Sequence, residues 1–317
     1  MRIEPLRQTC LIDVAEWEQD AEFGIYPQGA RAKDAVFVPE TPPDAVLVPN
    51  KRYMFKRSNK KYPDQWWGEV VAYRVGCLMG LEVPPAFVSW NSTTGICAAL
   101  IEWFSIDGQE VSTLAGDFLQ QRHPDFDREK GTQHNLQHVI TLLRSLVQGK
   151  VLISDHWHQW WTDALLFDAL IGNTDRHQDN WGFIFKTKPE TGPQARLMPL
   201  FDNGTSLGHE RFPDRVATWK EADYTRYIHK GKHHIAWSLD EPRIKGHREL
   251  LIRVLEAWPE TREMAKARLA AVTEHSLLDV LSDLAHIPAP VALSQPRFDF
   301  ILKLLKSRTH YLKEVLS

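Results

Sequence analysis

The sequence predicts an α+β fold in two lobes, a small β-rich N-terminal lobe followed by a mostly helical C-terminal lobe. Three short apolar segments bounded by turn-forming residues lie between residues 51 and 108, as expected of strands. Beyond residue 247 the apolar residues instead recur at helical spacing. We therefore place the N-terminal lobe at residues 1–105 and the C-terminal lobe at residues 106–317.

The N-terminal lobe is expected to contain strands around one helix. KRYMFKRS (Lys51–Ser58) is a strand candidate, and QWWGEVVAYRVGCLMG (Gln65–Gly80) is a helix candidate with apolar residues along one stripe. LEVPPAFVSW (81–90) predicts a second strand. GICAALIEWFSIDG (Gly95–Gly108) predicts a third strand that runs into a loop.

The chemistry-bearing part of the C-terminal lobe is expected to consist of a helix, a polar loop and a hairpin. HWHQWWTDALLFDALIG (His156–Gly172) has helical spacing and ends in glycine. WGFIF (181–185) and ARLMPLF (195–201) predict two short strands, because both are apolar and the connector is rich in Gly, Pro and Lys. Further amphipathic helices are expected at Arg248–Trp258, Glu260–Val272, Ser276–Ile287 and Phe298–Leu316.

Composition limits the class of protein. The 317 residues are 43% hydrophobic, enough for a buried core, and their net charge of −3 gives no global reason to expect direct nucleic acid binding. The N-terminus lacks a signal-peptide core and no segment is long enough to span a membrane, so we expect a cytoplasmic protein. Cys10, Cys77 and Cys97 form no CxxC site and suit a reducing compartment as packing residues.

The most informative segments are GNTDRHQDNWGFIF (Gly172–Phe185) and LMPLFDNG (Leu197–Gly204). Phosphoryl transfer needs a carboxylate near the attacking hydroxyl and oxygen ligands that hold Mg²⁺ on the phosphates of ATP. Asp175 is the candidate catalytic base. Asn180 and Asp202 are the candidate metal ligands, because Mg²⁺ prefers oxygen donors and keeps several waters.

DRHQDN followed by FDNG resembles the catalytic and metal loops of HipA-type bacterial kinases and of phosphoinositide-kinase-like enzymes. The resemblance spans roughly Ile25 to Gly208 and implies a two-lobed protein-kinase-like fold, ATP and Mg²⁺ as cofactors, and a Ser or Thr hydroxyl of a protein as acceptor. In ordinary protein kinases the histidine precedes the catalytic Asp, whereas His177 follows Asp175. His177 is therefore a second catalytic candidate by resemblance to the lipid kinases, and a role in bracing the loop is equally open.

A nucleotide site in the N-terminal lobe needs a cation for the phosphates, and Lys56 is the candidate. Glu69, in the following helix, is placed to pair with Lys56, which is the usual device for fixing that lysine. In HipA-like kinases a strand ending Glu-x-Phe is the hinge whose backbone meets adenine. The resemblance assigns this role to Glu102, Trp103 and Phe104.

PQGARAKDAVFVPE (Pro27–Glu40) is similar to the Gly-Ala-Gln-x-Lys phosphate loop of the same family, with arginine in place of glutamine. HipA has a regulatory serine three residues before this glycine, whereas Tyr26 stands here, so that regulation is not carried over. The nucleotide-binding candidates of the loop are Gly29, Ala30, Arg31 and Lys33.

Other functions stay open at this point. A phosphoinositide or other small-molecule acceptor is the alternative within the fold, and a pseudokinase or regulatory nucleotide-binding module is the non-catalytic alternative. The resemblance also admits a small antitoxin or accessory protein as partner. HKGKHH (His229–His234) lacks HExxH or CxxC spacing and is interpreted as a solvated basic loop rather than a zinc site. Most tryptophans fall at helical spacing, which favours core packing over a ligand cage.

Overall fold

The computed structural model describes residues 2–21, 33–153, 156–189, 192–241 and 246–317. The chain divides into two compact units, each assembled from three separate stretches. Unit 1 comprises Met1–Trp103, Asn203–Trp219 and Ala271–Lys306, and unit 2 comprises Phe104–Asp202, Lys220–Ala270 and Ser307–Ser317. The division into lobes after residue 105 stays a prediction.

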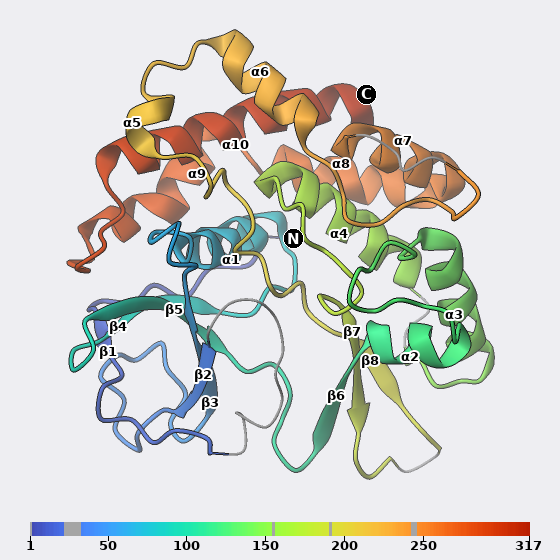
Figure 1. Cartoon of the computed structure of the whole chain (residues 1–317), viewed down its shortest axis with the longest axis horizontal. Coiled ribbons are helices and arrows are strands. Elements are labelled where there is room, and N and C mark those ends of the chain that lie inside the picture. Colours follow the sequence, from blue (N-terminus) through green and yellow to red (C-terminus); the bar gives the residue numbers. More distant parts are fainter. Residues whose placement is uncertain (1, 22–32, 154–155, 190–191, 242–245) are drawn as a thin grey trace. The chain divides into compact units, whose positions relative to one another are not determined.

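Unit 1 contains a sheet that is antiparallel except for one parallel pair (Figure 1). Among the described residues its spatial order is β1 (Ile12–Asp13), β4 (Ala86–Asn91), β5 (Ile96–Glu102), β3 (Arg52–Arg57) and β2 (Lys33–Phe37). The strands predicted from the sequence are confirmed, and the last of them ends at Glu102. Apolar side chains of one face form a buried core that includes Ile12, Val36, Phe55, Phe87 and Leu100.

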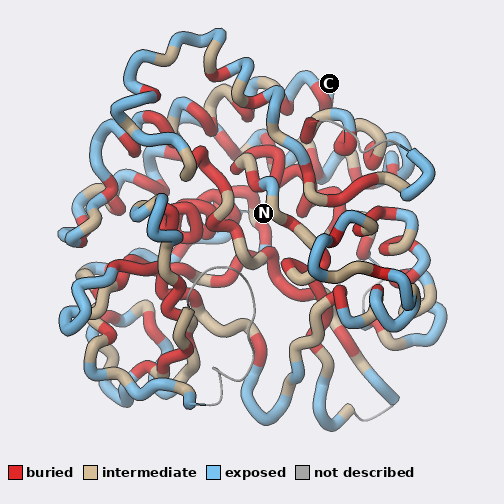
Figure 2. Tube along the Cα trace, viewed as in Figure 1, coloured by how far each residue is buried: buried red, intermediate tan, exposed pale blue. Residues whose placement is uncertain are grey.

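Helix α1 (Trp67–Met79) of unit 1 confirms the predicted helix and is buried along its whole length (Figure 2). A helix without an exposed face is expected to be apolar all round, yet α1 carries two charged residues, Glu69 and Arg74. Arg74 pairs with Asp283 at 3.0 Å, also in unit 1. The partner of Glu69 belongs to the site described below.

Unit 2 contains an antiparallel sheet of β6 (Glu110–Leu114), β7 (Gly182–Lys186) and β8 (Ala195–Leu197), with β7 in the centre among the described strands. Helix α4 (Trp157–Ile171) precedes β7 and ends at Gly172, which has a φ of 72°. This left-handed conformation is easiest for glycine and commonly ends helices. The predicted helix and hairpin are confirmed, and residues 172–181 form the loop that joins them.

The remaining helices support these two frameworks. They are α2 (Ala115–Arg122), α3 (Leu136–Gln148), α5 (Pro213–Val216), α6 (Glu221–Lys230), α7 (His247–Ala257), α8 (Arg262–Ala270), α9 (Glu274–Leu281) and α10 (Gln295–Leu316). Helices α7 to α10 confirm the four amphipathic helices, although the third turns into a 3₁₀ helix at Ser282–His286. The sequence interpretation did not include β1, β6, α2, α3, α5 or α6.

The tryptophans and cysteines were expected to be packing residues of the core. Trp66, Trp67, Trp157 and Trp161 are buried, which confirms their place in the core. Cys77 and Cys97 are buried as well, and Cys10 is half-buried. No helix within the described ranges combines the length and apolar character that crossing a membrane requires.

Candidate active site

Lys56 on β3 and Glu69 on α1 form a buried ion pair within unit 1. Lys56 Nζ lies 2.8 Å from Glu69 Oε1, and the two side chains are 3% and 4% exposed. The second carboxylate oxygen, Oε2, accepts the backbone N–H of Asn203 at 2.9 Å. Charges this far from water are stable only when they are paired and hydrogen-bonded. Glu69 therefore holds both the phosphate-binding lysine candidate and the residue that follows Asp202 in the chain.

Lys33 opens β2 directly opposite Lys56 of β3. Opposite residues of an antiparallel pair project from the same face of the sheet, so two lysines share one face here. Glu69 already pairs with the charge of Lys56. Binding of phosphate by Lys33 and Lys56 stays a prediction. Gly29, Ala30 and Arg31, the other phosphate-loop candidates, lie outside the described residues and stay predictions.

Glu102 is the last residue of β5 and Trp103 follows it, and both side chains make contacts within unit 1. The Glu102 carboxylate accepts hydrogen bonds from the Lys51 ammonium and, at 3.0 Å, from the Tyr53 hydroxyl. Burial and this carboxylate raise the pKa of Tyr53, which keeps the phenol protonated as a donor. The Trp103 ring lies 5.0 Å from the Arg52 guanidinium. The backbone N–H groups of Glu102 and Trp103 donate to the carbonyls of Pro85, at 2.8 Å, and Arg52, at 3.1 Å, and the contact with adenine stays a prediction.

Phe104 begins unit 2 and is anchored to the strand region that leads to Asp202. Its ring centroid lies 5.2 Å from that of Phe201. Its carbonyl accepts a hydrogen bond from Arg196 Nη2 at 3.2 Å. The third hinge candidate is thus linked, within unit 2, to the residue just before the metal-ligand candidate.

Asp175 lies in the loop between α4 and β7, and its backbone is held on both sides. Its N–H donates to Asn173 Oδ1 at 3.0 Å, and its carbonyl accepts the N–H of His177 at 2.8 Å. The same carbonyl also accepts from the side-chain amide of Asn180. Asp175 itself is half-buried. The loop therefore fixes the backbone of Asp175, a residue that is not fully buried, as suits a base that meets an acceptor hydroxyl.

Arg176 and Asp168 form a buried bidentate pair beneath this loop. Arg176 Nε and Nη2 lie 3.0 and 2.7 Å from the two Asp168 oxygens, and the side chains are 1% and 0% exposed. Arg176 Nη1 donates to the carbonyls of Asn180, at 3.1 Å, and Phe201, at 2.6 Å. A planar guanidinium with donors at fixed angles suits such a junction. One side chain thus ties Asn180 to the residue preceding Asp202.

Asn180 and Asp202 provide the kind of donors that Mg²⁺ prefers. Because Asn180 Nδ2 donates to the Asp175 carbonyl, Oδ1 is the donor that a metal ion would use. Asp202 has a φ of 56°, a left-handed conformation that is strained for a residue with a side chain and is concentrated at functional sites. In the parts of the chain that the structure describes, no three His, Cys, Asp or Glu side chains form a metal-binding group. An amide oxygen, one carboxylate, water and substrate phosphate form a set that fits Mg²⁺.

His177 makes a hydrogen bond within the loop at residues 172–181. Its Nδ1 accepts the backbone N–H of Asp179 at 3.1 Å, which places the ring proton of a neutral histidine on Nε2. Its ring meets the edge of His234 with 5.7 Å between centroids. The bond to Asp179 supports a bracing role. A direct part of Nε2 in catalysis stays a prediction.

The segment at residues 123–135 packs against the catalytic loop. Arg128 lies 2.8 Å from Asp179 and also pairs with Asp117 of α2. The Arg128 carbonyl accepts a hydrogen bond from Gln178 Nε2 at 2.6 Å. Asp125, Glu129, Lys130 and Thr132 of this segment are exposed, whereas these polar contacts hold Arg128. The segment thus lies beside the loop at residues 172–181, which contains Asp175.

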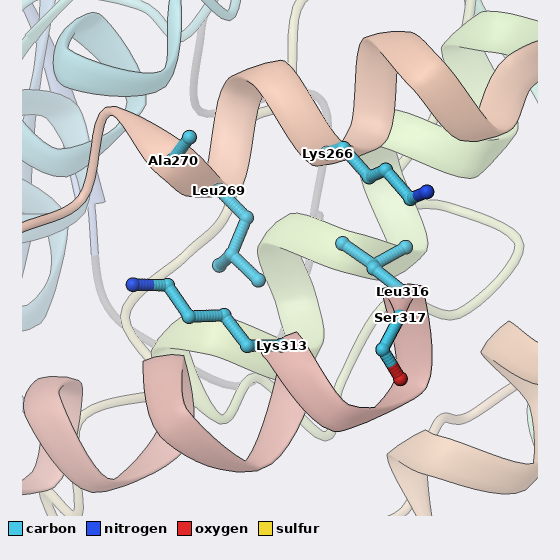
Figure 3. Close-up of a pocket in the computed structure, with 6 residues that line it drawn as sticks. All are labelled: Lys266, Leu269, Ala270, Lys313, Leu316 and Ser317. Atoms are coloured by element: carbon cyan, nitrogen blue, oxygen red, sulfur yellow. The ribbon is translucent and has the colours of Figure 1, made fainter.

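A pocket of about 210 Å³ lies in unit 2 between α8 and the end of α10, away from these residues (Figure 3). It is lined by Lys266, Leu269, Ala270, Lys313, Leu316 and Ser317. None of the catalytic or metal-ligand candidates contributes to it. We assign it no part in phosphoryl transfer.

Sequence reasoning missed the residues that position the site. Arg176 lies inside the DRHQDN motif, and Asp168 interrupts an apolar helix, which is a usable sign that a buried carboxylate needs a partner. Asn173 and Asn203 carried no comparable signal, because each acts through hydrogen bonds made only in the folded chain.

Two solved structures show the class of fold. The structure of the Helicobacter pylori proinflammatory kinase CtkA is similar with a TM-score of 0.74 and 17% identity, covering 96% of both chains. HipA from the Shewanella oneidensis toxin–antitoxin complex with HipB and operator DNA is similar with a TM-score of 0.51 and 12% identity, covering 92% of this chain and 66% of that one. The fold is therefore protein-kinase-like, as the sequence predicted.

Sequence comparison then identifies the family. The family described as HipA-like C-terminal domain matches residues 26–275, and the chain belongs to this family. The serine/threonine-protein kinase CtkA of Helicobacter pylori is 32% identical over 173 residues, 51% of this chain and 49% of the relative. The chain thus matches about half the length of this curated relative. The similarity supports a kinase-like phosphotransferase.

Proposed function

We propose that this chain is an ATP- and Mg²⁺-dependent kinase that phosphorylates a Ser or Thr hydroxyl of a protein. The observation that carries the proposal is the junction at Arg176, which holds the backbone of Asn180 and of the residue before Asp202 in one buried network. Asp175 lies in the same loop. The proposal is supported further by the paired Lys56 and Glu69, the two charged groups that a kinase needs in its nucleotide lobe.

Each residue has a distinct task in this proposal. Lys56, fixed by Glu69, binds phosphate oxygens of ATP, and the backbone around Trp103 meets adenine. Asn180 and Asp202 hold Mg²⁺, which when bound neutralises charge on the phosphates. Asp175 orients the acceptor hydroxyl and takes its proton as the oxygen bonds to the γ-phosphorus and ADP leaves. The hydrogen bond from the Asp175 N–H to Asn173 Oδ1 keeps Asp175 in place for that proton transfer.

The acceptor class is inferred from similarity. The relative CtkA is named a serine/threonine-protein kinase. A phosphoinositide or small-molecule acceptor, and a pseudokinase that binds nucleotide without turnover, are the competing functions. The chain has Lys56, Glu69, Asp175, Asn180 and Asp202, which favours turnover over the pseudokinase.

We also propose that this chain has a partner protein and a cytoplasmic location. The related Shewanella HipA was crystallised with HipB and operator DNA, so a small antitoxin-like or accessory protein is a reasonable partner for this chain. We propose no direct contact between this chain and nucleic acid, since its net charge is slightly negative.

The acceptor class is tested by incubating the purified protein with γ-labelled ATP and Mg²⁺, in parallel with a cell protein extract and with phosphoinositide vesicles. Label on serine or threonine of proteins, lost when EDTA removes Mg²⁺, is the expected result. Label in lipid alone would transfer the assignment to the phosphoinositide alternative. Nucleotide binding without label in either acceptor would favour the regulatory module.

A further inference from the structure

His247 connects the catalytic loop to the helical body of unit 2. It is the first residue of α7 and is 2% exposed. Its Nε2 lies 3.0 Å from the carbonyl oxygen of Asn173, so Nε2 carries the proton and donates it. Its Nδ1 lies 3.4 Å from Arg308 Nη1 and accepts from that guanidinium. Both ring nitrogens of His247 are thus used.

Asn173 passes this connection on to Asp175. While its carbonyl accepts from His247, its side-chain oxygen accepts the backbone N–H of Asp175 at 3.0 Å. Its side-chain nitrogen donates to Asp168 at 3.0 Å. A single residue, two positions before the proposed base, is therefore fixed at three polar atoms. Moving its carbonyl would move the amide group that holds Asp175.

Arg308 anchors the other end of the chain of contacts. Its Nη1 also donates to the carbonyl of Ala169, in the last turn of α4, at 2.9 Å. A cation at this end of a helix satisfies carbonyls that have no partner in the helix and interacts favourably with the helix dipole. A side chain on Gly172 would clash, since a Cβ there would lie 2.6 Å from Arg308 Nη2. Hydrogen bonds thus connect Arg308 of α10 to His247 of α7, and His247 to Asn173 of the loop at residues 172–181.

The surroundings of His247 favour a neutral imidazole. Burial is the main cause that lowers its pKa well below the usual value, followed by His233, whose ring centroid is 4.5 Å away, and by Arg308, while the carbonyls of Asn173 and Lys232 oppose this shift. Gly231 leaves room for the ring, since a Cβ there would lie 2.9 Å from it. A neutral imidazole with its proton on Nε2 can accept from Arg308 and donate to Asn173 at the same time. An aliphatic side chain of similar size can do neither.

We propose that His247 is a positioning residue of the catalytic loop, which through Asn173 sets the place of Asp175 for phosphoryl transfer. The proposal rests on the function proposed for Asp175. The proposal predicts that substitution of His247 lowers kcat, because the loop carries the proposed base Asp175. It predicts little change in KM for ATP, because His247 is not proposed to contact adenine. Glutamine can reproduce one donor and one acceptor, so His247→Gln should replace His247 in part, whereas His247→Leu should not.

The test compares His247→Leu, His247→Gln and Val254→Ala in the full chain. Val254 is buried on the same helix but makes no bond to the loop, so its variant controls for general loss of stability. Hydrogen exchange of the peptide 172–181 and the steady-state constants kcat and KM for ATP are measured at one pH. His247→Leu should speed exchange and lower kcat between about ten- and a hundredfold with KM within about twofold. His247→Gln should stay within about threefold of wild type in kcat.

The proposal is overturned if His247→Leu exchanges and turns over no differently from Val254→Ala. It is also overturned if His247→Gln is as impaired as His247→Leu, because hydrogen bonding would then not be the cause. If the wild-type protein phosphorylates no acceptor, the proposed function fails, and hydrogen exchange of residues 172–181 still decides whether His247 orders the loop.

Discussion

Glu69 accepts the backbone N–H of Asn203 at 2.9 Å while its other oxygen pairs with Lys56 at 2.8 Å. The carboxylate thus joins a strand, a helix and the segment that follows Asp202, all within unit 1. Both partners of Glu69 would remain buried if it were removed. The pair is therefore a point where stability and nucleotide binding can be separated by experiment.

Glu69→Ala should destabilise the protein by about 3–5 kcal/mol, since it removes the carboxylate that pairs with the buried Lys56 ammonium. Glu69→Gln should cost less, because an amide oxygen can still accept from Asn203. The double variant Lys56→Met with Glu69→Leu should recover part of the stability, yet bind Mg²⁺-ATP poorly. Denaturant unfolding and nucleotide titration of the three variants measure both quantities. Normal nucleotide affinity in the double variant would remove Lys56 from the phosphate site.

The role of Asp202 is tested by two substitutions, which differ in how readily the new residue adopts a left-handed backbone conformation. Both Asp202→Asn and Asp202→Ala remove the carboxylate, and each should weaken Mg²⁺-dependent ATP binding at least about tenfold, since even indirect supports of a metal site have effects of that size. Alanine should in addition lose about 1 kcal/mol of stability, because it adopts the left-handed φ of 56° less readily than Asn. Calorimetric titration with and without Mg²⁺ measures the effect. Unchanged Mg²⁺-dependence in both variants would exclude Asp202 as a ligand.

Arg176→Lys should disrupt the junction between the two metal-ligand segments. A lysine ammonium cannot reproduce the bidentate contact with Asp168 together with bonds to two carbonyls. We expect kcat to fall between about ten- and a hundredfold, because the ligands lose their fixed positions. Arg144→Lys, an exposed position on α3 in the same unit, is the matched control. Equal turnover of the two variants would show that the Arg176 fork is dispensable.

His233 predicts a pH dependence of stability. Burial is the largest cause that lowers its pKa from 6.5 to about 4, opposed by Asp168 and reinforced by Arg176 and Arg308, with the His247 ring packed against it. The unfolded chain therefore binds a proton that the folded chain does not between pH 6.5 and 4. Stability from neutral His233 is fully present above pH 6.5 and is lost as the pH falls, at up to about 1.4 kcal/mol per pH unit.

His233→Phe should flatten this dependence, since it keeps an aromatic ring and removes the titrating group. Denaturant unfolding at a series of pH values between 7 and 4 gives the slopes. A substitution of His310, whose side chain is 84% exposed, serves as the control and should leave the slope unchanged. A His233→Phe protein with the wild-type slope would contradict the assignment.

The parts of the site that sequence could predict are those carried by local patterns. Helix α4, its glycine end and the hairpin follow from periodicity and turn residues, and the Lys56–Glu69 pair was predicted from the lysine–glutamate pair that kinases use in the nucleotide lobe. The contacts that position these parts span long separations, 134 residues between Glu69 and Asn203 and 74 between Asn173 and His247. Such hydrogen bonds exist only in the folded chain and leave no periodic signal.

The most direct test of phosphoryl transfer is the rate at which γ-labelled phosphate passes from Mg²⁺-ATP to protein with wild type, Asp175→Ala and Thr174→Ala. Thr174 is the exposed neighbour of the proposed base, so its variant controls for disturbance of the loop. We predict that wild type and Thr174→Ala label serine or threonine at similar rates, while Asp175→Ala still binds Mg²⁺-ATP and transfers more slowly by about a hundredfold or more. Near-normal transfer by Asp175→Ala would contradict the assignment of Asp175 as the catalytic base.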